Sequence, residues 1–334
     1  MNLRIALEGG VVRALAALPV AIQRRIAGPP VEIDGQRLET EVQMLIRLRE
    51  RDPRPELETL PVAGARELIE EEAATVKGRP KPLAEVREID AGGLPARLYV
   101  PKDERGALLV YYHGGGWVVG SLDSHDSACR FLARESRIRV LSVDYRLAPE
   151  AKFPAAVDDG LAAFLWAREH AAELGADPER IAVGGDSAGG NVAAVVAQLA
   201  DPKPALQLLI YPVCDLSTKH ESYRLFGKGF FLTESNMDWY RGHYLPDEDA
   251  ASDPRASPLL AGDVSGLPRT YLAIAGFDPL RDEALAFGHK LELAGVEVDL
   301  VVHEGLIHGF ANATGIGRTS AAAMRQAAEA LARI

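Results

Sequence analysis

The chain has 334 residues, of which 47% are hydrophobic and 25% charged, a composition typical of a globular protein with a large core. Its 37 Lys and Arg against 48 Asp and Glu give a net charge of −11, which argues against nucleic acid as a partner. Cys129 and Cys214, the two cysteines, lack the spacing of a disulfide framework or a zinc site, so we expect no metal and a reducing, cytoplasmic location.

Residues 14–22 form an apolar run that follows Arg4 and Arg13 and resembles a secretory signal in part. Glu8 and Pro19 interrupt the pattern, and basic residues follow where a cleavage site would belong. No stretch approaches the roughly 20 uninterrupted apolar residues that a membrane-spanning helix requires. We therefore expect neither a signal peptide nor a membrane span.

The first 80 residues or so have a helical pattern, with apolar residues such as Leu38, Val42 and Ile46 at the 3.6-residue period. Prolines divide this region into short helices, at Pro29, Pro30, Pro53 and Pro61.

From about residue 84, β-rich runs alternate with helical stretches. The eight candidate strands are residues 85–90, 94–100, 107–112, 139–145, 181–184, 206–211, 270–275 and 296–303. An Ala-Gly-Gly turn joins the first two, which predicts an antiparallel hairpin at one edge. The later runs are continuously apolar, which favours a mostly parallel eight-stranded α/β sheet covered by helices on both faces.

After Cys214 this alternation lapses into an insertion that is rich in aromatic residues: Tyr223, Phe226, Phe230, Phe231, Trp239, Tyr240 and Tyr244. We expect it to form a helical cap over the carboxyl edge of the sheet, where ligands bind in open α/β folds. The predicted organisation is residues 1–50 as the N-terminal part of the cap, 214–255 as the cap insertion, and 51–213 with 256–334 as the catalytic domain.

The motif Gly185-Asp-Ser-Ala-Gly189 follows a predicted strand and opens an apolar helix. This is Gly-x-Ser-x-Gly in the strand–turn–helix context in which small residues allow a sharp turn that presents the serine hydroxyl. Ser187 is therefore the predicted nucleophile.

A second motif, His113-Gly-Gly-Gly-Trp117, lies at the end of the strand at 107–112. Consecutive glycines leave backbone N–H groups free to approach a developing oxyanion, and the motif is typical of lipases and esterases. Phosphate binding is excluded because neither a Lys-Ser/Thr pair nor the Gly-x-Gly-x-x-Gly spacing is present.

A nucleophilic serine of this fold needs an acid and then a histidine later in the chain. His308 follows the last predicted strand, and Asp278 follows the strand at 270–275. Asp282 is the alternative acid, although it reads as a charge in the first turn of a helix. His303 reads as a packed or solvated strand residue, and His113 as part of the glycine loop.

The chain resembles the bacterial hormone-sensitive-lipase-like (family IV) carboxylesterases of the α/β-hydrolase superfamily, in their Gly-Asp-Ser-Ala-Gly branch. Besides the two glycine motifs, the resemblance rests on Asp278-Pro-Leu-Arg-Asp-Glu283, His308-Gly-Phe310 and Tyr145-Arg-Leu-Ala-Pro-Glu150. It implies hydrolysis of short-to-medium acyl esters without a cofactor, a helical cap, and frequent homodimers.

The resemblance also places the oxyanion-hole amides at Gly115, Gly116 and Ala188, and suggests an ion pair between Asp144 and Arg146. We expect six residues to contact the substrate: Trp117 and Asp186 beside the catalytic motifs, and Phe230, Phe231, Trp239 and Tyr240 of the cap.

The predicted function is that of a serine carboxylesterase, with a small-molecule ester and water as reactants. A hydrolase of another acyl bond (amide, thioester or carbamate) uses the same triad and is the main alternative. A non-catalytic ligand-binding relative is disfavoured because His308 is retained.

Overall fold

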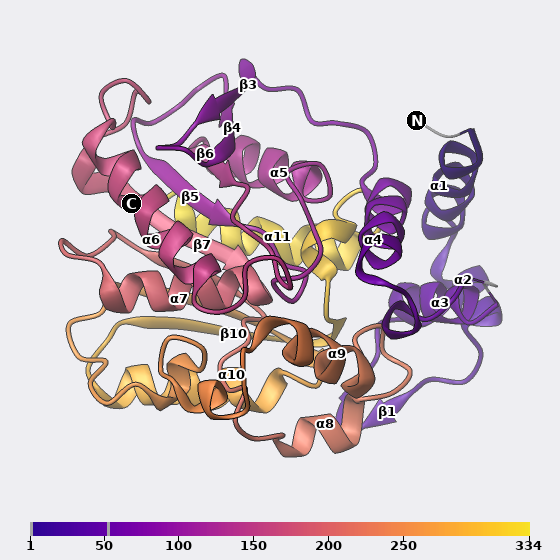
Figure 1. The fold of residues 1–334 in the computed structure, drawn as a ribbon. Coiled ribbons are helices and arrows are strands. Elements are labelled where there is room, and N and C mark those ends of the chain that lie inside the picture. Colours follow the sequence, from indigo (N-terminus) through magenta and orange to yellow (C-terminus); the bar gives the residue numbers. More distant parts are fainter. Residues whose placement is uncertain (1–2, 52–53) are drawn as a thin grey trace.

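The predicted sheet is present, with eight strands in the order β10-β9-β8-β7-β5-β6-β4-β3 (Figure 1). The computed structural model describes residues 3–51 and 54–334. The strands are β3 (Glu85–Asp90), β4 (Pro95–Val100), β5 (Leu108–Tyr112), β6 (Arg139–Val143), β7 (Ile181–Asp186), β8 (Gln207–Ile210), β9 (Thr270–Phe277) and β10 (Val298–Ile307). Strand β4 pairs antiparallel with both β3 and β6, and the other pairings are parallel. The antiparallel hairpin at one edge is thus confirmed.

Helices cover both faces of the sheet because its central strands are apolar on both sides. On one face, Val110 and Val183 pack into a core shared with α6, α7 and α10. On the other face, Leu109 and Ala182 pack against α5 and α11. These helices are α5 (Asp126–Ser136), α6 (Ala155–Glu169), α7 (Ala188–Leu199), α10 (Arg281–Leu293) and α11 (Arg318–Leu331).

The remaining helices are those of the N-terminal region and the insertion. They are α1 (Leu3–Ala16), α2 (Val20–Ala27), α3 (Thr40–Arg49), α4 (Val62–Val76), α8 (Glu221–Phe226) and α9 (Glu234–Tyr244). Short 3₁₀ helices are η1 (Leu57–Thr59), η2 (Pro178–Arg180), η3 (Asp249–Ser252), η4 (Pro258–Leu260) and η5 (Phe310–Ala313). Pro53, one of the predicted helix breaks, lies outside the described residues.

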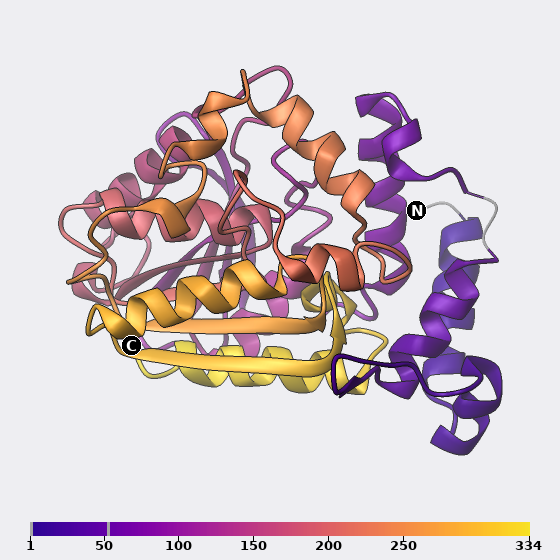
Figure 2. The ribbon, with the colours of Figure 1, turned by 90° about the horizontal axis from the view of Figure 1, so that it is seen from below.

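The N-terminal helices lie at one end of the molecule, as both ribbon views show (Figures 1 and 2). A two-stranded hairpin that the sequence did not predict, β1 (Glu32–Ile33) with β2 (Gln36–Arg37), connects α2 to α3. The buried Glu41 of α3 accepts hydrogen bonds from the backbone N–H groups of Arg318 (3.2 Å) and Thr319 (2.8 Å) at the start of α11. A carboxylate at a helix N-terminus is a favourable contact, so α3 is attached to the body of the fold.

Helices α8 and α9 follow β8 and lie near the end of the sheet where the parallel strands finish (Figure 2). Helix α9 begins with a capping box. The Thr233 side chain accepts from the Asn236 backbone N–H, and the Asn236 side chain accepts from the Thr233 backbone N–H. No helix in the described part of the chain is long and apolar enough to cross a bilayer.

Candidate active site

Ser187 lies in a sharp turn between β7 and α7. Its backbone has φ 54° and ψ −120°, a left-handed conformation that non-glycine residues adopt only under constraint. The turn is tight because Gly185 and Gly189 both approach the Tyr112 carbonyl oxygen so closely that a Cβ on either would overlap it. Ser187 is buried, with 8% of the residue exposed.

Ser187, His308 and Asp278 lie within hydrogen-bonding distance in series. His308 Nε2 is 2.9 Å from Ser187 Oγ, and His308 Nδ1 is 2.7 Å from Asp278 Oδ2. The second oxygen of Asp278 accepts from the Leu280 N–H at 2.9 Å, which fixes the carboxylate. A neutral imidazole oriented in this way has its Nδ1 proton on the aspartate and its Nε2 lone pair on the serine hydroxyl.

The two alternative residues have other contacts. Asp282 accepts from the Ser222 N–H at 2.8 Å and from Arg281 Nε at 2.8 Å, and so helps to join α8 to α10. His303 on β10 packs edge-on against Phe310, and burial lowers the pKa of its imidazole.

The loop from His113 to Trp117 follows β5 and reaches the same edge of the sheet. Gly114 N–H donates to Asp186 Oδ1 at 3.0 Å, and a Cβ on Gly114 would lie 2.6 Å from Asp186 Oδ2. Within the described ranges, no hydrogen bond of the protein uses the N–H groups of Gly115, Gly116 or Ala188. These three amides are therefore available to a bound oxyanion.

Buried groups hold the glycine loop in place. The Tyr145 hydroxyl donates to the His113 carbonyl at 2.7 Å, and the two rings stack with centroids 4.5 Å apart. Burial, together with the nearby His125, lowers the pKa of His113 to about 4, so this imidazole is neutral at physiological pH.

Asp186, next to Ser187, is 3% exposed and accepts a 2.6 Å hydrogen bond from the Tyr111 hydroxyl. Burial opposes its charge. The nearby His125 and the hydrogen bonds from Tyr111 and Gly114 outweigh burial and lower the pKa of Asp186 to about 2. An ionised carboxylate therefore joins the glycine loop to the turn that carries Ser187.

The matches to known proteins agree with this geometry. A family model described as the α/β-hydrolase fold matches residues 109–312. The carboxylic ester hydrolase LipN of Mycobacterium tuberculosis is 51% identical over 252 residues, which are 72% of this chain and 67% of LipN. The chain belongs to the α/β-hydrolase superfamily, in the hormone-sensitive-lipase-like branch.

Other relatives of this hydrolase have similar names. Ethyl acetate hydrolase of Pseudomonas putida is 42% identical over 260 residues, covering 74% of this chain and 82% of that protein. The solved hyperthermophilic esterase of Pyrobaculum calidifontis has a TM-score of 0.84 and 36% identity, covering 89% of this chain and 98% of its own.

The six residues expected to contact substrate have different surroundings in the hydrolase. Trp117 is fully buried and stacks on Tyr244 of α9, with centroids 4.1 Å apart. Tyr240, also buried, packs its ring on Gly116 so closely that a Cβ on Gly116 would overlap it. Phe230 packs against Phe277, whereas Trp239 is half-buried.

Phe231 differs from these buried aromatics because 50% of it is exposed. A Cβ on Gly309 would lie 3.0 Å from Phe231 Cε1, so the ring lies beside the residue that follows His308. Of the six, Phe231 thus combines exposure with a position beside the turn that follows His308.

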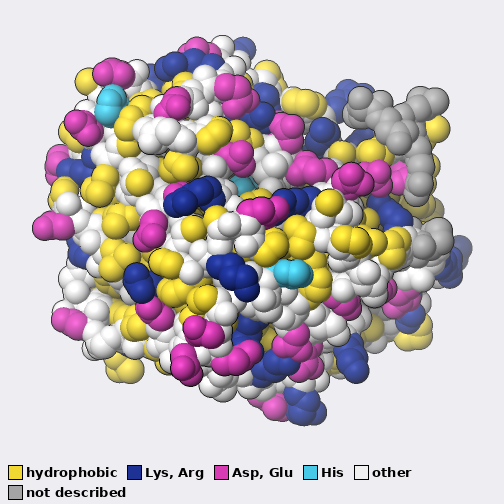
Figure 3. Space-filling model, viewed as in Figure 1, with side chains coloured by type: hydrophobic (Ala, Val, Ile, Leu, Met, Phe, Trp, Pro, Cys, Tyr) yellow, Lys and Arg dark blue, Asp and Glu magenta, His cyan; other side chains and the backbone are white. Residues whose placement is uncertain are grey.

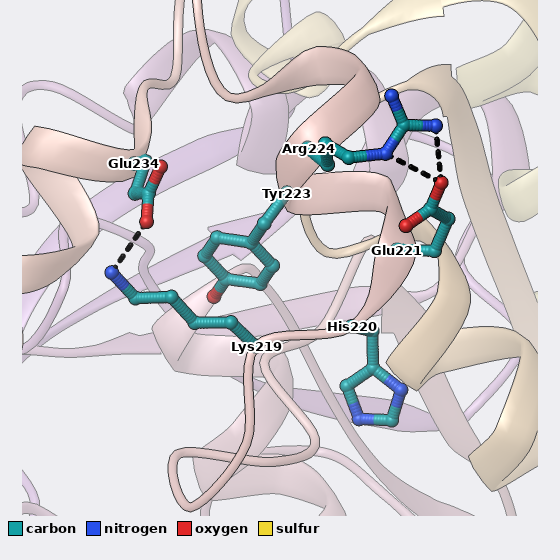
Figure 4. A pocket seen from close by; sticks show the side chains of 6 residues that line it. All are labelled: Lys219, His220, Glu221, Tyr223, Arg224 and Glu234. Carbon is teal, nitrogen blue, oxygen red and sulfur yellow. Dashed lines mark hydrogen bonds and ion pairs between the residues drawn. The ribbon is translucent and has the colours of Figure 1, made fainter.

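A hollow of about 350 Å³ lies in the insertion, lined by Lys219, His220, Glu221, Tyr223, Arg224 and Glu234 (Figure 4). Its charged groups pair with one another, Lys219 with Glu234 and Arg224 with Glu221. The residues that line the hollow do not include Ser187, His308 or Asp278, so the hollow is separate from the atoms of that hydrogen-bonded series.

One expectation was wrong: Arg146 does not pair with Asp144. Its guanidinium binds Asp159 of α6, with Nη2 2.6 Å from Oδ1 and Nε 2.9 Å from Oδ2, and its N–H also donates to Oδ2 at 2.9 Å. Asp159 makes a bidentate contact with the guanidinium and also accepts from the Arg146 backbone N–H. This set of charge-assisted hydrogen bonds favours Asp159 over Asp144 as the partner of Arg146.

Several residues close to the site were not predicted. Tyr211 lies at the end of β8, with its ring 4.5 Å from that of His308, and its hydroxyl accepts from the Ala311 N–H at 3.1 Å. Its position at a strand's carboxyl end was a signal that could have identified it. His125 and Asn312 belong to no recognised motif.

Proposed function

We propose that this enzyme is a serine carboxylesterase that hydrolyses short-to-medium acyl esters through an acyl-enzyme on Ser187. The observation that carries the proposal is the continuous series of short contacts from Ser187 Oγ through His308 to Asp278, at a turn with a strained nucleophile. The names of the relatives, among them an ethyl acetate hydrolase, support an ester as substrate.

In the proposed acylation step, Ser187 attacks the ester carbonyl while His308 Nε2 takes the hydroxyl proton. The amides of Gly115, Gly116 and Ala188 donate to the oxyanion, and Asp278 stabilises the imidazolium. His308 then gives its proton to the departing alcohol.

In the proposed deacylation step, a water molecule takes the place of the alcohol. The water oxygen attacks the acyl carbon while His308 removes one of its protons. The bond between Ser187 Oγ and the acyl carbon then breaks, His308 returns the proton to Oγ, and the carboxylic acid is released. Every step is a proton transfer or an acyl transfer among the substrate, water and these residues, so the mechanism we propose uses no cofactor or metal.

For the substrate pocket, we propose Phe231 as the first candidate contact, because it is exposed beside the turn that carries His308. Trp239 and Phe230 follow it. The buried contacts of Trp117, Tyr240 and Asp186 support a role in shaping the glycine loop rather than a broad contact with substrate.

We further propose that residues 1–50 and 214–255 form the cap over the catalytic domain, and that the enzyme is cytoplasmic and a homodimer. Two buried free thiols, Cys129 and Cys214, support the reducing location. Acidic and basic side chains are interspersed over the face shown in Figure 3, which fits a small-molecule partner better than a polyanion.

The test is hydrolysis of p-nitrophenyl acetate, butyrate, octanoate and palmitate by the full chain. We expect turnover of the shorter esters, and loss of at least about 10³-fold in kcat for Ser187→Ala and for His308→Ala. Ser265→Ala, on an exposed loop, is the matched control and should retain the parent rate.

Two results would contradict the proposal. One is an inactive parent chain, and the other is a Ser187→Ala variant as active as the Ser265→Ala control. Faster cleavage of a matched p-nitroanilide than of the ester would instead assign an amide as the substrate.

A further inference from the structure

His125 is not part of the hydrogen-bonded series of Ser187, His308 and Asp278. It lies directly before α5 and is only 3% exposed. Its Nε2 atom lies 3.2 Å from the Gly114 nitrogen and 3.1 Å from Asn312 Nδ2. The same atom lies 3.4 Å from Asp186 Oδ1. One ring nitrogen thus faces three segments that are remote from one another in the sequence.

Each of these segments carries one part of the proposed mechanism. Gly114 immediately precedes the proposed oxyanion donors, Asp186 immediately precedes Ser187, and Asn312 lies in η5, four residues after His308. His125 is the point at which the oxyanion loop, the nucleophile turn and the turn behind the catalytic base come together.

The hydrogen bonds select one form of the His125 ring. The Ser124 hydroxyl donates to the Ser121 carbonyl at 3.0 Å, so toward His125 Nδ1, 3.0 Å away, it acts as acceptor. Nδ1 therefore carries a proton. In the neutral ring Nε2 accepts from the Gly114 N–H, and in the protonated ring it faces the Asp186 carboxylate, 3.4 Å away, as a donor.

We infer that His125 is a positioning residue for the hydrolysis: its Nε2 atom, through contacts with Gly114, Asp186 and Asn312, keeps the oxyanion loop correctly placed relative to Ser187 and His308. This inference rests on the proposed function. The Gly114 N–H is shared between Asp186 and His125, so losing one acceptor frees the peptide that sets the direction of the next two amides. Misplacement by about 1 Å is enough to reduce a rate by about 10²-fold.

Two substitutions of similar polarity distinguish the effect of a polar atom at the Nε2 position from the effect of losing the imidazole ring. His125→Gln places an amide oxygen at about the reach of Nε2, whereas the shorter His125→Asn reaches only about as far as Nδ1. We expect His125→Gln to keep kcat within about 5-fold of the parent, and His125→Asn to lower kcat by about 10–10²-fold with KM nearly unchanged. His289→Asn, on an exposed histidine of α10, is the control.

Kinetics are measured on p-nitrophenyl butyrate below the unfolding temperature of every variant, with active sites counted by phosphonylation of Ser187. A kcat for His125→Asn equal to that of the control would overturn the inference. So would equal losses in both His125 variants, because the acceptor would then not be what matters.

Amide hydrogen exchange at Gly114 gives a second readout that does not depend on turnover. We expect faster exchange in His125→Asn than in His125→Gln, and identical exchange in the two would also overturn the inference. If the parent chain hydrolyses no ester, the proposed function fails, while this measurement still decides whether His125 holds the loop.

Discussion

At the scale of single residues, Asp278 and Asp282 are four positions apart but have different partners. Asp278 is buried against His308, whereas Asp282 binds Ser222 and Arg281. In Asp278→Asn, the amide would donate where a carboxylate accepted, and would favour the wrong imidazole tautomer. We predict a loss of about 10³–10⁴-fold in kcat on p-nitrophenyl butyrate.

Asp282→Asn is the matched control, because it removes the same charge only four positions further along the chain. Its kcat should remain within about 3-fold of the parent, since its partners join α8 to α10 and do not include the reacting atoms. A variant at position 282 that is as impaired as the one at 278 would refute the proposed role of Asp278.

The residues of the site divide into those that the sequence could predict and those that it could not. Ser187, His308 and the glycine loop stand in motifs whose chemistry dictates the spacing, so they could be proposed from the sequence. His125 and Asn312 come together only because β5, α5 and η5 meet at one edge of the sheet. No local pattern connects residues 187 positions apart.

At the scale of elements, α9 is in contact with the glycine loop at residues 113–117. Tyr240 packs on Gly116 and Tyr244 stacks on Trp117, and these tyrosines, four residues apart, share one face of the helix. The helix therefore supports the loop, so that aromatic residues predicted to line a pocket partly serve to hold the backbone amides of the glycine loop.

Two glycine substitutions test this contact. Gly116→Ala should lower kcat by about 10²-fold or more and the free energy of unfolding by about 2 kcal/mol, because its φ is +58° and its Cβ would overlap Tyr240. Activity and urea unfolding measure the two effects.

Gly242→Ala is the control on α9 itself. A Cβ there meets nothing within 4 Å, so alanine should raise the free energy of unfolding by about 0.5–1 kcal/mol and leave kcat unchanged. Equal activity in both variants would mean that α9 does not constrain the loop.

The strands were predicted well because the central ones are short, continuous apolar runs. Their ends were predicted less well. Strand β10 continues four residues beyond the expected end at His303, since Ile307 pairs with Phe277 after an irregularity in the register. That extension depends on a neighbouring strand, and the two-residue strands β1 and β2 are too short for any periodicity to show.

At the scale of the whole molecule, hydrogen bonds and an ion pair connect the N-terminal helices to several separate segments of the α/β fold. Arg66 of α4 donates to the Val118 carbonyl at 2.9 Å and to the Ala148 carbonyl at 3.0 Å, and also pairs with Glu150. Glu41 of α3 binds the start of α11, and together with the contacts of Arg66 this holds α3 and α4 against the rest of the fold. The part of the region nearest the glycine loop is therefore fixed by specific hydrogen bonds.

The burial of His113, at the start of the glycine loop, makes the stability of the whole protein depend on pH. The pKa of His113 is about 4 in the fold, below the 6.5 of a free histidine, because burial and His125 disfavour its charged form. The unfolded chain therefore binds more protons than the folded one between these values. The stabilisation is fully present above about pH 6.5 and is lost as the pH falls toward 4.

We predict that His113→Gln weakens this dependence. A shift from 6.5 to about 4 corresponds to about 3 kcal/mol, so the parent should lose about 3 kcal/mol more than the variant between pH 7 and pH 4. Buried Glu283, whose pKa burial raises well above its usual value, has the opposite slope but is common to both proteins and cancels in the comparison. Urea unfolding at several pH values measures the difference, and parallel curves for parent and variant would show that His113 is not the group responsible.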